Sequence, residues 1–232
     1  MVSFGQKLSS AVLAVPKKFC VNVHSSLLPR WRGAAPINRA ITEGDSRAGV
    51  TIMKMNEHMD RGDIILSRST PIGADDDAVV LARRLAQMGA QALQEALSAV
   101  EQGTACFTPQ DEAEATVAKK LKKEDGLIDW QRTARHIHNQ VRGLLPWPCA
   151  YTHYKGMFIK VLKTTLITER MDCRQKFSPG QVVAVEKNKG IIIAADDAPL
   201  LIETLQSEGK RAMSAYDFVL GHHVQAGDAF GT

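Results

Sequence analysis

Short apolar runs alternate with helical apolar patterns over the first hundred residues. Apolar positions recur at helical spacing after an acidic cap at 75–77, and Gly103 ends this pattern, so a long helix is expected between them. A shorter helix is expected over 36–43, with Pro36 in its first turn. Runs rich in β-branched and apolar residues predict strands at 19–24, 49–55 and 64–66. This order of elements predicts an α/β layer.

The pattern changes after Pro109. Residues 109–125 are polar, then lysine-rich, and predict a linker between a first domain at 1–108 and a second at 126–232. In the second domain a helix is expected over 133–144 and a closing helical turn over 214–220. Short extended runs punctuated by glycine predict a small β-barrel or sandwich, with strands at 150–154, 157–167, 181–186, 190–195 and 199–205.

The composition is that of a globular chain with unevenly distributed charge. Its 232 residues are 44% hydrophobic and 23% charged, which excludes a wholly disordered chain. The net charge of +4 is too small to indicate nucleic-acid binding. Residues 119–176, however, hold 13 Lys and Arg against 5 Asp and Glu. This segment is a candidate surface for a polyanionic partner, and a merely solvated surface explains the charge equally well.

The lack of a secretory-signal pattern in residues 1–20 and the wide spacing of the cysteines indicate a reducing compartment. No apolar run is long enough to span a bilayer, and residues 1–20 lack the pattern of a secretory signal. The cysteines are widely spaced and form no CxxC pair, so free thiols and a cytoplasmic location are expected for a chain with Cys20, Cys106, Cys149 and Cys173.

Candidate chemistry gathers at the end of the first predicted strand. Strand alternation places Asn22 and His24 on one side, and Asp60 lies in a later polar turn. An amide can stabilise an oxyanion, an imidazole can exchange a proton near neutral pH, and a carboxylate can orient the imidazole. Because the chain has no GxSxG nucleophile elbow, direct acyl transfer to an external amine is favoured over an acyl-enzyme.

Each of these residues also has a purely structural interpretation. An Asn-x-His at a strand end is commonly a hydrogen-bonded turn, and Asp60 within Asp-Arg-Gly-Asp is a common turn former. His136 and His138 diverge on a helix because they are two residues apart, so no metal site is expected.

Longer stretches resemble one enzyme family. Asn-Val-His-Ser-Ser-Leu-Leu-Pro-Arg-Trp-Arg-Gly-Ala-Ala-Pro-Ile, at 22–37, resembles the hallmark of the folate-dependent formyltransferases. Residues 49–53 and 59–63 match the downstream pattern of the same family. Ile-Asp-Trp at 128–130, Leu-Pro-Trp-Pro at 145–148 and Gln-Ser-Glu-Gly-Lys-Arg-Ala-Met-Ser at 206–214 resemble its C-terminal domain.

The resemblance implies a fold and a reaction. The fold is a partial doubly wound, Rossmann-like formyltransferase domain followed by a small OB-like β-barrel that binds tRNA. The reaction moves a formyl group from 10-formyltetrahydrofolate to the α-amine of methionine on initiator tRNA, without metal. A monomer with no membrane partner is expected.

The resemblance also implies roles for particular residues. By position the catalytic residues are Asn22, His24 and Asp60. The segment expected to line the folate site is Ser26, Leu27, Leu28 and Pro29. Cations expected to meet the tRNA are Arg30, Arg32, Lys119, Lys120, Lys122 and Lys123.

The chain departs from the family at its start. Family members carry further strand–helix units before the position of Met1, so the N-terminal part of the catalytic domain is missing by this comparison. A wrong start codon, a split gene, an isolated fragment and a true truncation all remain open. The chain made alone is expected to be poorly stable and weakly active, because lost strands would leave a sheet edge and a helix face uncovered. A formyltransferase for a small amine and a non-catalytic tRNA-binding remnant are the alternatives.

Overall fold

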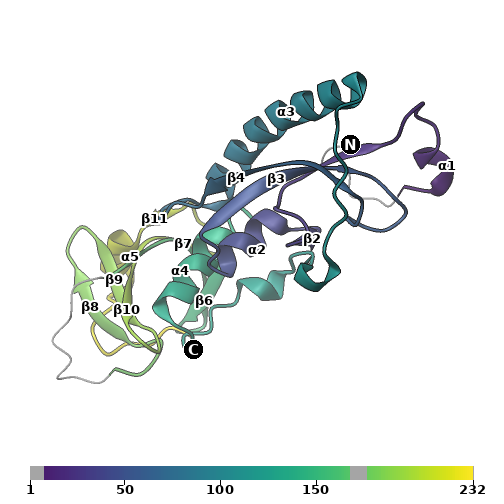
Figure 1. Cartoon of the computed structure of the whole chain (residues 1–232). Helices are drawn as coiled ribbons and strands as arrows, with labels where there is room; N and C mark the ends of the chain where they lie inside the picture. Colours follow the sequence, from purple (N-terminus) through teal and green to yellow (C-terminus); the bar gives the residue numbers. More distant parts are fainter. Residues whose placement is uncertain (1–7, 168–176, 232) are drawn as a thin grey trace. The chain divides into compact units, whose positions relative to one another are not determined.

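The computed structural model describes residues 8–167 and 177–231, and the chain divides into two compact units (Figure 1). The first unit comprises residues 1–41 and 45–121, and the second comprises 42–44 and 122–232. The segment 109–125, expected to be a linker, therefore contributes to the first unit as far as Leu121. Cys173 and the end of the basic segment 119–176 lie outside the described residues.

The first unit is built on a three-stranded sheet in the order β1-β3-β4. Its elements are α1 (Ser10–Leu13), β1 (Val21–His24), β2 (Arg32–Gly33), α2 (Pro36–Thr42), β3 (Arg47–Lys54), β4 (Ile64–Pro71), α3 (Ala78–Gln102), the 3-10 helix η1 (Glu112–Glu114) and β5 (Val117–Ala118). The strands and both helices expected from the apolar pattern are confirmed, with β4 longer than the run that predicted it.

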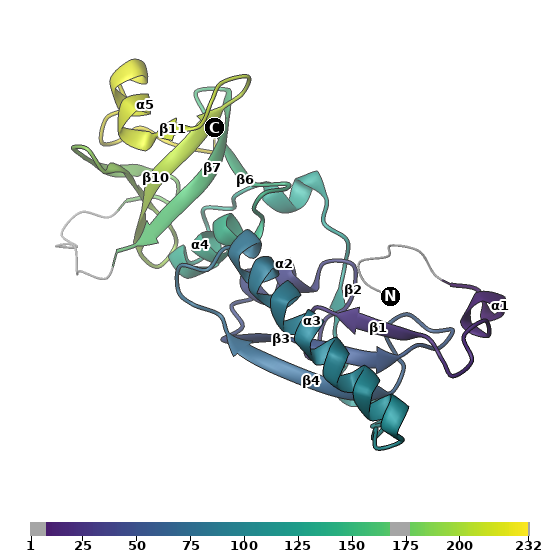
Figure 2. The ribbon, with the colours of Figure 1, turned by 90° about the horizontal axis from the view of Figure 1, so that it is seen from above.

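Helix α3 lies along β3 and β4, as Figures 1 and 2 both show. The Asp77 side chain caps its start by accepting a hydrogen bond from the Val80 backbone N–H, and Gly103 ends it with a left-handed φ of 72°. Leu81 and Leu85 of the helix join Val50 and Ile52 of β3 in one buried cluster. Burial of this face holds the helix on the sheet.

The α/β class is confirmed, and the described part of this sheet is antiparallel. β1 pairs with β3 and β3 with β4, both antiparallel. Residues 55–63 form the loop that joins the antiparallel neighbours β3 and β4. Parallel pairing occurs in the described residues where β2 meets β5, with Arg32 opposite Val117.

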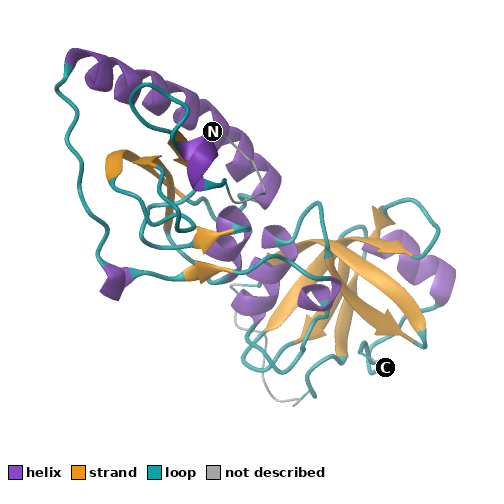
Figure 3. Ribbon diagram, turned by 90° about the vertical axis from the view of Figure 1, so that its right-hand side faces the viewer, coloured by secondary structure: helices purple, strands orange, loops and turns teal. Residues whose placement is uncertain are grey.

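The second unit is a small β-barrel with the α-helices α4 and α5 and the 3-10 helix η2 (Figure 3). Its strands run in the order β6-β7-β10-β9-β8, with β11 on β10, and all these pairs are antiparallel. Bridges from Tyr154 to Phe230 and from Gln181 to Ala229 link the two outer strands through one C-terminal segment. The elements are η2 (Lys123–Gly126), α4 (Ala134–Gly143), β6 (Ala150–Tyr154), β7 (Met157–Leu166), β8 (Val182–Glu186), β9 (Gly190–Ala194), β10 (Pro199–Ser207), β11 (Met213–Ser214) and α5 (Ala215–His222).

No helix in the described part of the chain has the length and apolar character required to cross a lipid bilayer.

A buried phenol ties the C-terminal segment to the barrel. The Tyr154 hydroxyl donates a 2.7 Å hydrogen bond to Asp228 Oδ2, and Lys155 Nζ lies 3.6 Å from the same oxygen. The Tyr154 hydrogen bond, helped by the Gln225 backbone N–H and the charge of Lys155, lowers the pKa of Asp228. The ionised carboxylate is therefore favoured by folding.

Asp228 should make the stability of the barrel sensitive to acid. Because its folded pKa lies below the unfolded value, its contribution is present above about pH 4 and is lost as the pH falls through the folded pKa. We expect Asp228→Asn to flatten the fall in unfolding free energy below about pH 4, measured by urea titration from pH 7 downward. The exposed Asp196→Asn variant is the control. Identical pH profiles for the Asp228 variant and the parent chain would contradict this assignment.

Candidate functional site

Strand β1 brings the first two candidate residues to one buried side. Asn22 and His24 are 9% and 6% exposed, and they alternate with half-buried Val21 and Val23. The strand alternation expected from the sequence is therefore present. No described residue hydrogen-bonds the Asn22 side chain, so its amide remains available.

Asp60 comes to the same place from the turn between β3 and β4. Its Oδ1 lies 3.7 Å from His24 Nδ1, and its Oδ2 accepts a 2.9 Å hydrogen bond from the Gly33 backbone N–H. The turn lies close against β3, since a Cβ on Gly62 would be 1.6 Å from the Lys54 carbonyl oxygen. The glycine at this position allows Asp60 to approach His24.

The two nitrogens of the His24 ring have different partners. Nε2 lies 2.9 Å from the Trp31 carbonyl oxygen. A carbonyl can only accept, so Nε2 carries the proton of this hydrogen bond. Nδ1 is then the nitrogen that faces Asp60, and it is the position at which the ring can exchange a proton.

Two residues at the site hold a left-handed backbone. Trp31 has φ 63° and Asp60 has φ 53°, a region that residues other than glycine rarely adopt. Trp31 is held there by its backbone N–H, which donates to Thr116 Oγ1, and by its indole N–H, which donates to Asp45. The strained backbone of Trp31 presents its carbonyl to His24.

Gln110 holds Asp60 from the other side. Its Nε2 donates 2.9 Å and 2.7 Å hydrogen bonds to the carbonyls of Asp60 and Gly62. Its Oε1 accepts from the Arg32 guanidinium at 3.0 and 2.8 Å. The sequence carries no signal for this role, because Gln110 lies in the segment expected to be a linker and its partners are about fifty or more residues away.

Arg32 is part of this internal network. Its side chain is 7% exposed, and it also donates two 2.9 Å hydrogen bonds to Glu112. These bonds lower the pKa of the Glu112 carboxyl. Arg32 was expected to meet tRNA, but its guanidinium donors are engaged by Gln110 and Glu112 inside the unit and do not face a phosphate.

The remaining expected cations are more accessible. Arg30 is half-exposed, pairs with Asp45 at 2.6 Å, and lies over the Trp31 ring at 4.4 Å. The lysines of the segment expected to be a linker are all exposed: Lys119, Lys120, Lys122 and Lys123.

The loop after β1 is held by Thr51 of β3, which lies in the segment 49–53 that matches the family pattern but was given no role there. The buried Thr51 hydroxyl donates to the Ser26 carbonyl at 2.7 Å and accepts from the Leu28 backbone N–H at 3.1 Å. Ser26 Oγ donates to the Arg30 carbonyl at 2.5 Å. Leu28 is buried, and Leu27 and Pro29 are half-buried, so the loop offers a preorganised apolar wall.

The arrangement suits acyl transfer. It combines an available amide, an imidazole with one fixed proton, and a carboxylate within ion-pair distance of its other nitrogen. Among the described residues, no group of three or more His, Cys, Asp or Glu side chains could hold a metal ion.

Sequence comparisons match both units. The family described as "Formyl transferase" matches residues 1–97, and "Formyl transferase, C-terminal domain" matches residues 120–223. A methionyl-tRNA formyltransferase from Geobacter metallireducens is 43% identical over 231 residues, which are 100% of this chain and 72% of that protein. One from Coxiella burnetii is 43% identical over 222 residues, 96% of this chain and 69% of its own length.

Solved structures with the same fold have lower identities. HypX from Aquifex aeolicus, in complex with tetrahydrofolic acid, gives a TM-score of 0.64 at 20% identity over 86% of this chain and 34% of its own. The sugar 3N-formyltransferase WlaRD, solved with dTDP and 5-N-formyl-THF, gives a TM-score of 0.64 at 20% identity, over 82% of this chain and 66% of its own. A methionyl-tRNA formyltransferase from Clostridium thermocellum gives a TM-score of 0.52 at 20% identity, over 67% of this chain and 69% of its own.

Proposed function

The chain belongs to the formyltransferase family, and on that basis we propose that it transfers a formyl group from 10-formyltetrahydrofolate to the α-amine of methionyl initiator tRNA. The observation that carries the assignment to this site is the approach of His24 and Asp60 to 3.7 Å, with Asn22 on the same side of β1. The relatives named above support the choice of acceptor.

Asn22, His24 and Asp60 divide the chemistry of the transfer between them. The neutral methionyl amine attacks the formyl carbon, and the Asn22 amide N–H stabilises the negative charge that develops on the formyl oxygen. The amine loses a proton as the new C–N bond forms, and His24 Nδ1 with Asp60 accepts it. The same proton returns to the folate nitrogen as the old C–N bond breaks.

The distance between Asp60 and His24 fits this role. At 3.7 Å the two atoms are too far apart for a direct hydrogen bond, so a water molecule or a small movement completes the contact when substrates are bound. The hydrogen bond from Gly33 to Asp60 Oδ2 and that from His24 Nε2 to Trp31 fix both groups in the meantime. The site is thus arranged before the substrate arrives.

We infer that the loop at Ser26–Leu27–Leu28–Pro29 lines the folate site. The partly buried apolar side chains offer a flat wall to a heteroaromatic ring, and Thr51 fixes the loop from below. The Ser26 hydroxyl is already bonded to the Arg30 carbonyl, so its role in this site is to shape the loop.

One assay separates this function from the alternatives. The chain is incubated with 10-formyltetrahydrofolate and either methionyl initiator tRNA or a dTDP-linked amino sugar, and the formylated products are quantified. Transfer to the tRNA is expected. Transfer to the sugar alone would favour the small-amine reaction, which the structural likeness to WlaRD suggests. Salt-sensitive tRNA binding without any turnover would favour a non-catalytic tRNA-binding protein.

The exposed lysines should supply affinity for tRNA that depends on salt. We expect replacement of Lys119, Lys120, Lys122 and Lys123 by Gln to weaken tRNA binding about tenfold or more near 0.1 M salt. The slope of log K against log salt should become shallower by roughly one for each lysine that no longer pairs with a phosphate. Filter binding over a salt series measures both quantities. Arg83→Gln with Lys187→Gln, two exposed cations elsewhere, is the control, and an equal loss there would oppose a specific role for the four lysines.

We also infer a monomer that acts in the cytoplasm, where charged initiator tRNA is used. The free thiols of Cys20, Cys106 and Cys149 support a reducing compartment. Sedimentation equilibrium should return the chain mass of 25.4 kDa, and a mass that doubles with concentration would oppose the monomer.

A further inference from the structure

One face of the barrel carries aromatic side chains with a cation beside them. Tyr151 and His153 of β6 alternate with buried residues, as do Phe158 and Lys160 of β7. Tyr151 lies opposite Lys160, and His153 lies opposite Phe158. On β10, Gln206 lies opposite Lys160 and continues the row. We call these five residues the aromatic face.

The three rings support one another. The Tyr151 and Phe158 ring centroids are 4.9 Å apart with planes tilted by 32°. His153 stands edge-on to Phe158 at 5.9 Å and to Tyr151 at 6.1 Å. All three side chains are half-buried, so each retains some accessible surface. Packed rings of this kind form a platform whose side-chain entropy is already lost before a ligand stacks on it.

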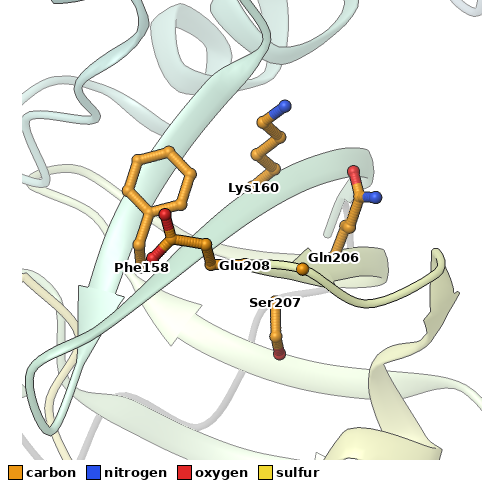
Figure 4. A pocket seen from close by; sticks show the side chains of 6 residues that line it. Phe158, Lys160, Gln206, Ser207 and Glu208 are labelled. Atoms are coloured by element: carbon orange, nitrogen blue, oxygen red, sulfur yellow. The ribbon is translucent and has the colours of Figure 1, made fainter.

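A pocket of about 170 Å³ opens beside Phe158. Figure 4 shows Lys160 and Gln206 projecting to one side of the strands near the Phe158 ring, with Glu208 next to the ring and Ser207 pointing the other way. The pocket is smaller than a site for a drug-sized ligand, so it suits a single ring system.

The charge around the pocket favours an anionic ligand. Lys160 has no ion-pair partner among the described residues, and the adjoining turn exposes Lys210 and Arg211. Gln206 Nε2 donates 2.7 Å to the Lys210 carbonyl and so holds this turn. Lys160 and Glu208 line the pocket itself, and the two further cations lie in the adjoining turn. A flat aromatic surface with surplus positive charge matches a base joined to a phosphate.

We propose that the aromatic face stacks one unpaired nucleotide of the tRNA substrate, a proposal that rests on the function proposed above. The base stacks on the part of the Phe158 ring that Tyr151 leaves uncovered, and Lys160 pairs with the adjoining phosphate. Gln206 and Glu208 offer an amide and a carboxylate to the base edge. Paired bases in a stem cannot offer a free face, so the ligand is a single-stranded nucleotide.

The test measures binding of short RNA to the full chain, so it does not depend on turnover. The probes are an unstructured RNA pentamer and a blunt RNA duplex without unpaired nucleotides. Phe158→Leu should weaken pentamer binding roughly 5- to 100-fold, the range expected when one base no longer stacks, and should leave duplex binding nearly unchanged. Phe158→Tyr keeps a ring and should restore affinity. Phe107→Leu, at a partly exposed phenylalanine of the first unit, is the matched control.

A second variant keeps the proposal testable if Phe158→Leu fails to fold. Lys160→Gln changes a half-exposed side chain and should lower the salt slope of pentamer binding by about one. The proposal is overturned if the parent chain does not bind the pentamer, if Phe158→Leu binds it normally, or if pentamer and duplex affinities fall together. It is also overturned if Phe158→Leu instead changes self-association. Normal formylation of methionyl-tRNA alongside any of these results would leave the proposed function standing.

Discussion

Replacing His24 by Ala should abolish most formyl transfer, with turnover falling about 10²- to 10⁴-fold. The variant removes the imidazole ring, whose Nδ1 lies 3.7 Å from the Asp60 carboxylate. The proton that the attacking amine loses then has no imidazole to accept it. It also frees the Trp31 carbonyl, so a small loss of stability should accompany the loss of rate. Initial rates with methionyl-tRNA at saturating formyl-folate measure the effect.

The exposed His58 provides the matched control, since it is the histidine nearest in sequence to Asp60 and has no part in the proposed chemistry. His58→Ala should retain the turnover of the parent chain. Formyl-folate affinity of His24→Ala should stay within a few-fold of the parent value, because His24 acts on the reacting atoms rather than on the pterin. If His24→Ala keeps full turnover, or loses turnover only in proportion to folate affinity, the proton-transfer role is wrong.

Gln110→Met should lower kcat by roughly 10- to 100-fold, although Gln110 is proposed to touch neither substrate. The change removes two donors from the Asp60 and Gly62 carbonyls and the acceptor of Arg32. Asp60 holds a left-handed backbone, which persists only while its surroundings enforce it. We therefore expect the carboxylate to shift away from His24. Steady-state kinetics and formyl-folate binding together measure the effect.

A positioning residue and a merely structural one are distinguished by whether kcat falls alone or together with the affinities for folate and tRNA. A positioning role predicts a fall in kcat with folate affinity and tRNA affinity kept. General loosening of the unit predicts that kcat, folate affinity and melting temperature all fall together. Gln110→Glu retains the acceptor for Arg32 but places a carboxylate beside two carbonyls, so it should be no better than Met. Gln91→Met, on the exposed side of α3, should behave as the parent chain.

Local patterns predicted the parts of the fold that depend on local physics. The period of two in β1 placed Asn22 and His24 on one side, and the acidic cap and Gly103 bounded α3 closely. The glycine-punctuated runs after Pro146 gave the strands of the barrel. Each of these signals lies within a window of a few residues.

Interactions between distant segments were not predictable in the same way. Arg32 looked like a surface cation because its charge is visible in the sequence, whereas its partners Gln110 and Glu112 lie 78 and 80 residues away. Polar composition indicated a linker over 109–125, but composition does not show that β5 pairs with β2. The antiparallel sheet depends likewise on strand order, which a local pattern leaves undetermined.

Because β5 pairs with β2, a shortened chain that keeps the first unit intact must extend beyond β5. A shortened protein ending at Thr108 would lack Gln110, Glu112 and β5 together, and the Arg32 guanidinium would lose its hydrogen bonds to Gln110 and Glu112. Proteases that nick between Leu121 and Lys122 would instead cut after the last segment of the first unit and leave β5 and its partners in place. Dissection of this enzyme into autonomous pieces should therefore follow the later boundary.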